Sequence, residues 1–164
     1  MTAKDARPSA VQAATVWLPL VAAAVCLLLA IPTLGARDLW YDEAFSVTST
    51  NQLWDSLIQR SGSMGLYYGM LALWSKVSID PFWLRLPSAL FAAAATGLAV
   101  RFTFTYFGRR TAAWTALILV GTWGLTRYAQ EARSYTLVLL LAVTSWYLFF
   151  HLAEHSTRRG WIWW

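Results

Sequence analysis

Long apolar runs separated by short polar stretches dominate the chain. A bilayer's hydrocarbon core is about 30 Å thick, and about 20 mostly apolar helical residues are needed to cross it. Runs of about this size predict an all-α membrane protein with about four transmembrane helices. The predicted spans cover residues 11–34, 82–107, 111–126 and 136–151.

The first apolar run follows a polar leader, residues 1–10, which contains Lys4 and Arg7. A basic leader before an apolar run is also typical of a signal peptide. However, the apolar part of a signal peptide is only about 7–15 residues long. Residues 11–34 form a longer run and further spans follow, so we expect this segment to stay in the protein as an anchor.

The largest segment between spans, residues 35–81, is too polar for hydrocarbon but keeps a helical spacing of apolar residues. The pattern predicts two helices lying along the membrane surface, with a break near residues 61–63. The apolar positions are Phe45, Leu53, Trp54, Leu57 and Ile58, followed by Met64, Tyr67, Leu71 and Trp74.

Basic residues near the predicted span ends indicate the orientation. Arg109 and Arg110 occupy a very short linker between the second and third spans, and basic residues concentrate on cytoplasmic loops. With the leader, this linker predicts a cytoplasmic N-terminus in the plasma (inner) membrane. Residues 35–81 and the polar turn 127–135 are then extracytoplasmic, and residues 152–164 form a cytoplasmic or interfacial end.

Composition supports a membrane protein over a soluble one. Of 164 residues, 58% are hydrophobic and only 13% are charged, whereas soluble domains carry about 25% charged residues. Eleven tryptophans are typical of membrane interfaces. The basic residues are spread along the chain between the apolar runs and do not form one cationic face, which argues against nucleic-acid binding. Cys26 is the single cysteine, which excludes an internal disulfide.

The first candidate for chemistry is an acidic patch just beyond the first span, residues 37–43 (RDLWYDE), in which Asp42 and Glu43 follow Trp40 and Tyr41. A carboxylate beside a hydroxyl can act as a general base, and paired carboxylates can bind a divalent cation. The same pair is also typical of the first turn of a helix, where negative charge is favourable. The local sequence leaves both interpretations open.

The second candidate is the polar turn 127–135. On a helix Arg127 and Glu131 are i,i+4 neighbours, while Gln130 and Arg133 are i,i+3 neighbours. Arg133 has the geometry to bind a phosphate at the water–lipid boundary. A polar cap that pairs with itself between two spans is the alternative.

Four short motifs occur in the same order in a known group of enzymes. They are residues 39–44 (LWYDEA), 66–68 (LYY), 84–88 (LRLPS) and 128–135 (YAQEARSY). With these motifs the chain resembles the N-terminal part of bacterial GT-C class membrane glycosyltransferases, relatives of dolichyl-phosphate-mannose protein mannosyltransferases and aminoarabinose lipid A transferases. The resemblance runs from residue 11 to the end.

The resemblance implies transfer of a sugar from a polyprenyl-phosphate carrier to an extracytoplasmic acceptor. Asp42 and Glu43 match the acidic reaction centre, with a divalent metal cation as a possible cofactor held by these two residues. The matching substrate-binding positions are Arg85, Tyr67, Tyr68, Gln130, Glu131, Arg133 and Tyr135. The donor lipid and the bilayer are the expected partners.

Two departures from the family pattern matter. Relatives often carry a His-Pro-Pro segment before the paired tyrosines, where this chain has residues 63–65 (SMG). The family also has more spans, so we expect that this chain is a truncated or split form. The alternative function is a non-catalytic polytopic subunit, for lipid binding or assembly, that keeps the GT-C scaffold.

Overall fold

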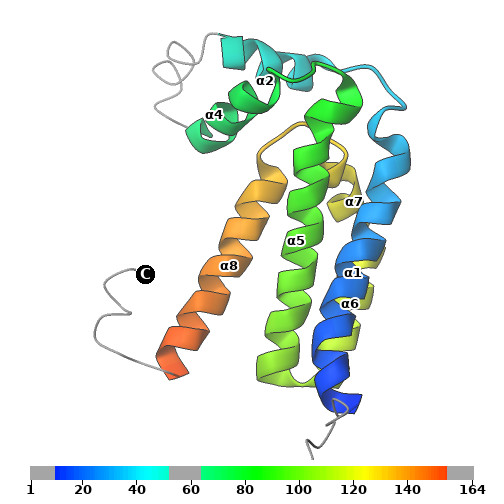
Figure 1. Cartoon of the computed structure of the whole chain (residues 1–164), viewed down its shortest axis with the longest axis vertical. Coiled ribbons are helices and arrows are strands. Elements are labelled where there is room, and N and C mark those ends of the chain that lie inside the picture. The colour runs from blue at the N-terminus through cyan, green and yellow to red at the C-terminus, as the bar shows by residue number, and fades with distance from the viewer. Residues whose placement is uncertain (1–9, 52–63, 155–164) are drawn as a thin grey trace, which may run out of the picture.

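The computed structural model describes residues 10–51 and 64–154, and every regular element within those ranges is a helix (Figure 1). The elements are α1 (Ala10–Leu34), α2 (Tyr41–Asn51), α4 (Gly65–Trp74), α5 (Pro81–Phe107), α6 (Arg109–Gly121), α7 (Trp123–Ala129) and α8 (Tyr135–Glu154).

Three of these helices are long and apolar enough to cross a membrane. They are Val16–Leu34 of α1, Pro81–Phe107 (α5) and Tyr135–Glu154 (α8). This confirms the all-helical membrane character that the apolar runs predict. The three helices also match the first, second and fourth predicted spans closely.

The predicted third span, residues 111–126, is not one continuous helix. α6 ends at Gly121, Thr122 has extended backbone angles (φ −78°, ψ 109°), and α7 begins at Trp123. Glycine is a poor helix former, and Gly121 and Gly124 flank the break. The hydrophobic pattern did not reveal this interruption because apolar residues stand on both sides of it, Ile118 to Val120 before and Trp123 and Leu125 after.

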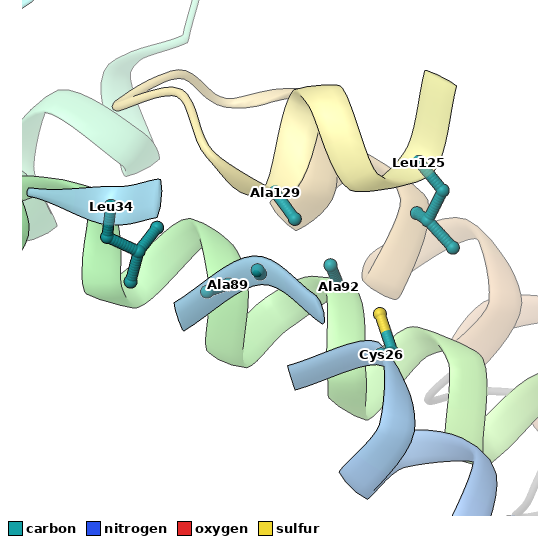
Figure 2. Packing of buried hydrophobic residues seen from close by; sticks show 7 residues of the cluster. Cys26, Leu34, Ala89, Ala92, Leu125 and Ala129 are labelled. Atoms are coloured by element: carbon teal, nitrogen blue, oxygen red, sulfur yellow. The ribbon is translucent and has the colours of Figure 1, made fainter. Parts of the chain in front are cut away.

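α5 is the central helix and packs against α1, α6, α7 and α8 (Figure 1). Small residues bring α1 and α5 close together: a Cβ on Gly97 would lie 3.2 Å from both the Ala23 Cβ and the Pro19 carbonyl oxygen. Figure 2 shows the same principle near one end, where Cys26 meets Ala92 and Leu125. Such small residues let apolar helices pack by van der Waals contact without large side chains.

α2 and α4 lie across one end of the bundle, above the end of α1 and the start of α5 (Figure 1). Trp74 of α4 and Trp83 of α5 stack with ring centroids 4.5 Å apart. Each indole N–H donates to the other residue's carbonyl oxygen, at 2.8 and 3.1 Å. This reciprocal contact fixes α4 against the first turn of α5.

These two helices agree with part of the periodicity predicted for residues 35–81. Phe45 lies in α2, and Tyr67, Leu71 and Trp74 lie in α4. The predicted apolar positions at residues 53–58 and the predicted break at residues 61–63 lie outside the described residues.

Candidate functional site

A buried ion pair organises the end of the bundle that α2 and α4 cover. Glu43 is in the first turn of α2 and is fully buried, while Arg85 of α5 is 3% exposed. The Arg85 Nε donates to the Glu43 Oε1 at 2.8 Å, and the Nη2 donates to the Oε2 at 2.6 Å. This two-pronged geometry suits a guanidinium and a carboxylate.

Every N–H donor of Arg85 is used. A guanidinium has five such donors, and the two that bind Glu43 leave three. The remaining donors bind three backbone carbonyls between the end of α1 and the start of α2. These are Leu34 (2.6 Å), Arg37 (2.8 Å) and Asp38 (3.0 Å). Arg85 therefore holds the loop after α1 in place, and no donor is left over for a phosphate.

Glu43 is equally well satisfied. Besides Arg85 it accepts from the backbone N–H of Ala132 at 2.9 Å and from that of Trp40 at 3.4 Å. Trp40 directly precedes α2, so Glu43 caps the N-terminus of its own helix, which is the alternative that the sequence left open. The contact with Ala132 joins α2 to the turn between α7 and α8.

Asp42 points elsewhere and is the exposed carboxylate of the pair. Its Oδ2 lies 2.7 Å from the Arg133 Nη1, and the Asp42 side chain is 66% exposed. The Arg133 guanidinium also lies 5.4 Å from the ring centre of Tyr135, which in turn packs on Tyr128. The structure therefore brings the acidic patch and the polar turn together.

The polar turn also pairs with itself, as its i,i+4 spacing predicted. Arg127 Nη2 lies 3.1 Å from the Glu131 Oε1. Glu131 is only 8% exposed, and this burial raises the pKa of its carboxyl, with Arg127 opposing the shift. The Arg127 guanidinium stacks 4.6 Å above the Trp40 ring, so it connects the turn to the loop before α2.

A polar cavity of about 190 Å³ lies between the end of α1, the loop that follows it and the end of α7. We call it the outer pocket. Its lining residues are Thr33, Arg37, Asp38, Trp40, Arg85, Arg127 and Gln130. Among the described residues, the side chains of Arg37 and Gln130 have no hydrogen-bond or ion-pair partner, so they are available to a ligand.

The paired tyrosines are buried in a cluster with Leu84 and Ala132. Tyr67 is 1% exposed and Tyr68 is 4% exposed, and their rings meet edge to face at 6.2 Å. The buried Tyr67 Oη has no hydrogen-bond partner among the described residues. Burial raises the Tyr67 pKa, and the neighbouring Ser88 hydroxyl only partly offsets this. Ser88 instead donates to the Arg133 carbonyl oxygen at 3.2 Å.

The structure thus brings six of the nine predicted site residues into one connected network. Asp42, Glu43, Arg85, Glu131 and Arg133 are joined by ion pairs or by the backbone of the turn, and Gln130 lines the outer pocket next to them. Tyr67 and Tyr68 support the network from the core, and Tyr135 lies at its edge with 41% of its surface exposed.

Sequence reasoning did not select the residues that form most of the outer pocket. Arg37, Asp38 and Trp40 belong to the acidic patch, and Arg127 belongs to the polar turn, but nothing local indicates that they share a cavity. The stacking of Arg127 on Trp40 joins positions 87 residues apart in the sequence. The one signal in the sequence was the high content of polar residues in the acidic patch and in the polar turn.

The two carboxylates do not form a shared cation site in this arrangement. Both Glu43 oxygens bind donors, and Asp42 is turned toward Arg133. Within residues 10–51 and 64–154, no group of three or more His, Cys, Asp or Glu side chains is placed to hold a metal ion.

Comparison with known proteins finds no family model, no curated protein and no solved structure that matches this chain.

Proposed function

We propose that this chain is a GT-C-type glycosyltransferase, or the N-terminal part of one, that moves a sugar from a polyprenyl-phosphate carrier to an extracytoplasmic acceptor. The observation that carries the proposal is the Asp42–Arg133 pair at 2.7 Å. It sets an exposed carboxylate beside a guanidinium at one end of a membrane helix bundle. The sequence motifs around both residues point to the same reaction.

The proposed chemistry assigns one role to each member of this pair. The Asp42 carboxylate takes the proton from an acceptor hydroxyl as that oxygen attacks the anomeric carbon of the sugar. The bond between the sugar and the phosphate oxygen breaks, and the carrier phosphate leaves with the electron pair. Two cations of this end of the bundle, Arg133 beside Asp42 and Arg37 in the outer pocket, stabilise the negative charge that develops on that phosphate.

Glu43 and Arg85 are positioning residues in this proposal. Their bonds fix the loop after α1, the start of α2 and the turn before α8 relative to one another. Asp42 and Arg133 each lie next to a residue of that network, so it sets their separation. Such fixed geometry is what an electrostatically assisted reaction requires.

The proposal includes a topology. The N-terminus is cytoplasmic, α6 and α7 together make a fourth crossing, and α2 and α4 lie at the extracytoplasmic surface of the inner membrane. The alternation of helix directions along the bundle supports this topology, because it gathers both polar patches at one end (Figure 1).

A non-catalytic membrane subunit is the second candidate function. The observation that favours it is that Arg133 already neutralises Asp42. In that case the pair simply fastens α2 to the turn before α8.

Replacement of Asp42 by asparagine separates the two candidates. Asparagine keeps the shape of the side chain and caps a helix about as well, but it cannot accept a proton. We expect Asp42→Asn to lower transfer of labelled sugar from polyprenyl phosphate, in membranes that contain the chain, by at least about 100-fold. Asp80→Asn is the matched control, because Asp80 is an exposed helix cap at the same end of the bundle.

The outcomes are distinct. Loss of transfer in Asp42→Asn with normal expression and normal transfer in Asp80→Asn supports the enzyme. Transfer at the wild-type rate by Asp42→Asn, or no transfer by the wild-type chain, favours the non-catalytic subunit.

A further inference from the structure

A second cavity lies along the same helix as the outer pocket. It is an apolar groove of about 520 Å³ between α1 and α6. Its lining includes Leu18, Ala22 and Val25 on α1, and Ala116, Leu117 and Gly121 on α6. Every lining side chain is aliphatic or absent, so the groove offers nothing to a polar ligand and suits a hydrocarbon chain.

One face of α1 connects the groove to the outer pocket. Leu18, Ala22, Val25, Leu29 and Thr33 follow one another at steps of three or four residues, which places them in one stripe of the helix. The first three line the groove and Thr33 lines the outer pocket. Leu29 lies between them and is 47% exposed. The helical rise from Val25 to Thr33 is about 12 Å.

α7 does not block this path. Cys26 and Ala30, on the adjacent face of α1, belong to one buried cluster with Leu125 and Ala129 of α7. Figure 2 shows Cys26 on the side of α1 that faces Leu125. A chain that leaves the groove therefore passes over the exposed Leu29 and not between α1 and α7.

The break between α6 and α7 occurs at one end of the groove. Gly121 lines the groove and is the last residue of α6, and Thr122 then departs from helical geometry. In proteins that cross membranes, interrupted helices are tolerated where they border a cavity or other protein. The glycine also leaves this end of the groove open, because a Cβ at position 121 would meet nothing within 4 Å.

We infer that the groove and the outer pocket together bind one amphiphile, with the hydrocarbon chain against α1 and α6 and the phosphate beside Arg37. The Arg37 guanidinium and the Gln130 amide, which have no partner within residues 10–51 and 64–154, supply donors at the polar end. The identity of this lipid as a polyprenyl phosphate rests on the proposed function. The bipartite shape, apolar over the groove and polar at the pocket, rests on the structure alone.

Filling the groove tests the inference. Gly121→Trp adds a large ring at a position that lines the groove and where a Cβ would meet nothing within 4 Å. Ile118→Trp is the matched control, because Ile118 lies one turn away on α6, is 63% exposed and does not line the groove. In phosphatidylcholine nanodiscs that contain labelled C55 polyprenyl phosphate, we expect Gly121→Trp to weaken binding by at least about tenfold, which is about 1.4 kcal/mol. Ile118→Trp should bind as the wild type does.

A second pair of variants tests the polar end of the proposed lipid site. Arg37→Gln should weaken binding of the polyprenyl phosphate but not of the corresponding polyprenol, which has no phosphate. Lys76→Gln, an exposed cation at the same end outside the outer pocket, should change neither. Inorganic phosphate that competes as well as the lipid phosphate would show that the groove contributes nothing, and would overturn the inference.

Photocrosslinking covers the case in which Gly121→Trp does not fold. A photoreactive residue at Leu117 in the otherwise unchanged chain should label the polyprenyl phosphate, and one at Ile118 should label mainly phosphatidylcholine. Crosslinks from Leu117 to a protein would show that another helix fills the groove, and equal labelling from both positions would show ordinary bilayer contact. Either result would refute the inference.

These measurements need no acceptor and no sugar transfer. Loss of the proposed function therefore appears in the Asp42→Asn transfer assay, whereas failure of the lipid site appears in binding by the Gly121→Trp and Leu117 variants. The two failures are distinguishable.

Discussion

Glu43 and Arg85 lie 42 positions apart in the sequence and form two hydrogen bonds of 2.6 and 2.8 Å in the buried layer between α2 and α5. Directly beside Glu43, Asp42 remains exposed and pairs with Arg133. Two adjacent acids thus have different surroundings, and the different surroundings imply different sensitivities to mutation.

Glu43→Gln should destabilise the protein severely. It removes one charge of a buried pair and leaves the Arg85 guanidinium without its counterion, which typically costs about 3–5 kcal/mol. Asp42→Asn breaks an exposed pair, which is worth about 0–1 kcal/mol. The free energy of unfolding of both variants in mixed micelles checks this, and similar values for the two would contradict the structural assignment of the pair.

Tyr67→Phe should keep or slightly raise the stability. The buried Tyr67 hydroxyl lacks a partner among the described residues, and an unsatisfied buried polar group costs about 1–3 kcal/mol. Its removal should therefore cost nothing in the thermal unfolding midpoint. A drop of several degrees would mean that the hydroxyl is bonded. Sugar transfer measured on the same variant tests the substrate-binding role predicted for Tyr67.

The stability of the wild type should fall relative to Glu131→Gln as the pH rises. Burial raises the Glu131 pKa in the folded protein despite the attraction of Arg127 and Arg133, and Glu43 and Asp42 add to the rise. A carboxyl with a raised pKa binds its proton more tightly in the folded state than in the unfolded state. Its stabilising contribution to the free energy of unfolding is therefore complete at low pH. That contribution disappears as the pH climbs from the ordinary glutamate range through the raised pKa.

Thermal unfolding midpoints of the two proteins across this pH range give the comparison. Glu131→Gln has no proton to lose at this position and supplies the reference. A wild type that gains stability relative to Glu131→Gln on going to higher pH would show that the Arg127 ion pair outweighs the burial.

Cysteine labelling should find the two ends of α5 on opposite sides of the membrane. In a Cys26→Ala background, Val77→Cys places a thiol at a position that is 72% exposed, just before α5. Thr111→Cys places one at an exposed position just after it. An impermeant maleimide added to intact cells should label position 77 alone. Labelling of position 111 alone would reverse the proposed orientation.

The local sequence was sufficient for much of the helix content. Length and hydrophobicity alone identified α1, α5 and α8, because a helix of about 20 apolar residues carries its own signal in every bilayer. The positions from Tyr67 to Trp74 likewise indicated α4 through their helical spacing. The i,i+4 pair of Arg127 and Glu131 was also readable, since the two partners are close in sequence, Arg127 in α7 and Glu131 just after its end.

The tertiary structure alone decided which polar residues meet. The contacts of Glu43 with Arg85 and Ala132, and of Asp42 with Arg133, join positions 42, 89 and 91 residues apart. No periodicity within a helix specifies such pairs, because they depend on how α1, α5 and α7 pack against one another. The same packing buries Glu43 and exposes Asp42. For that reason the sequence could identify an acidic pair but could not determine which acid is buried against Arg85 and which stays exposed beside Arg133.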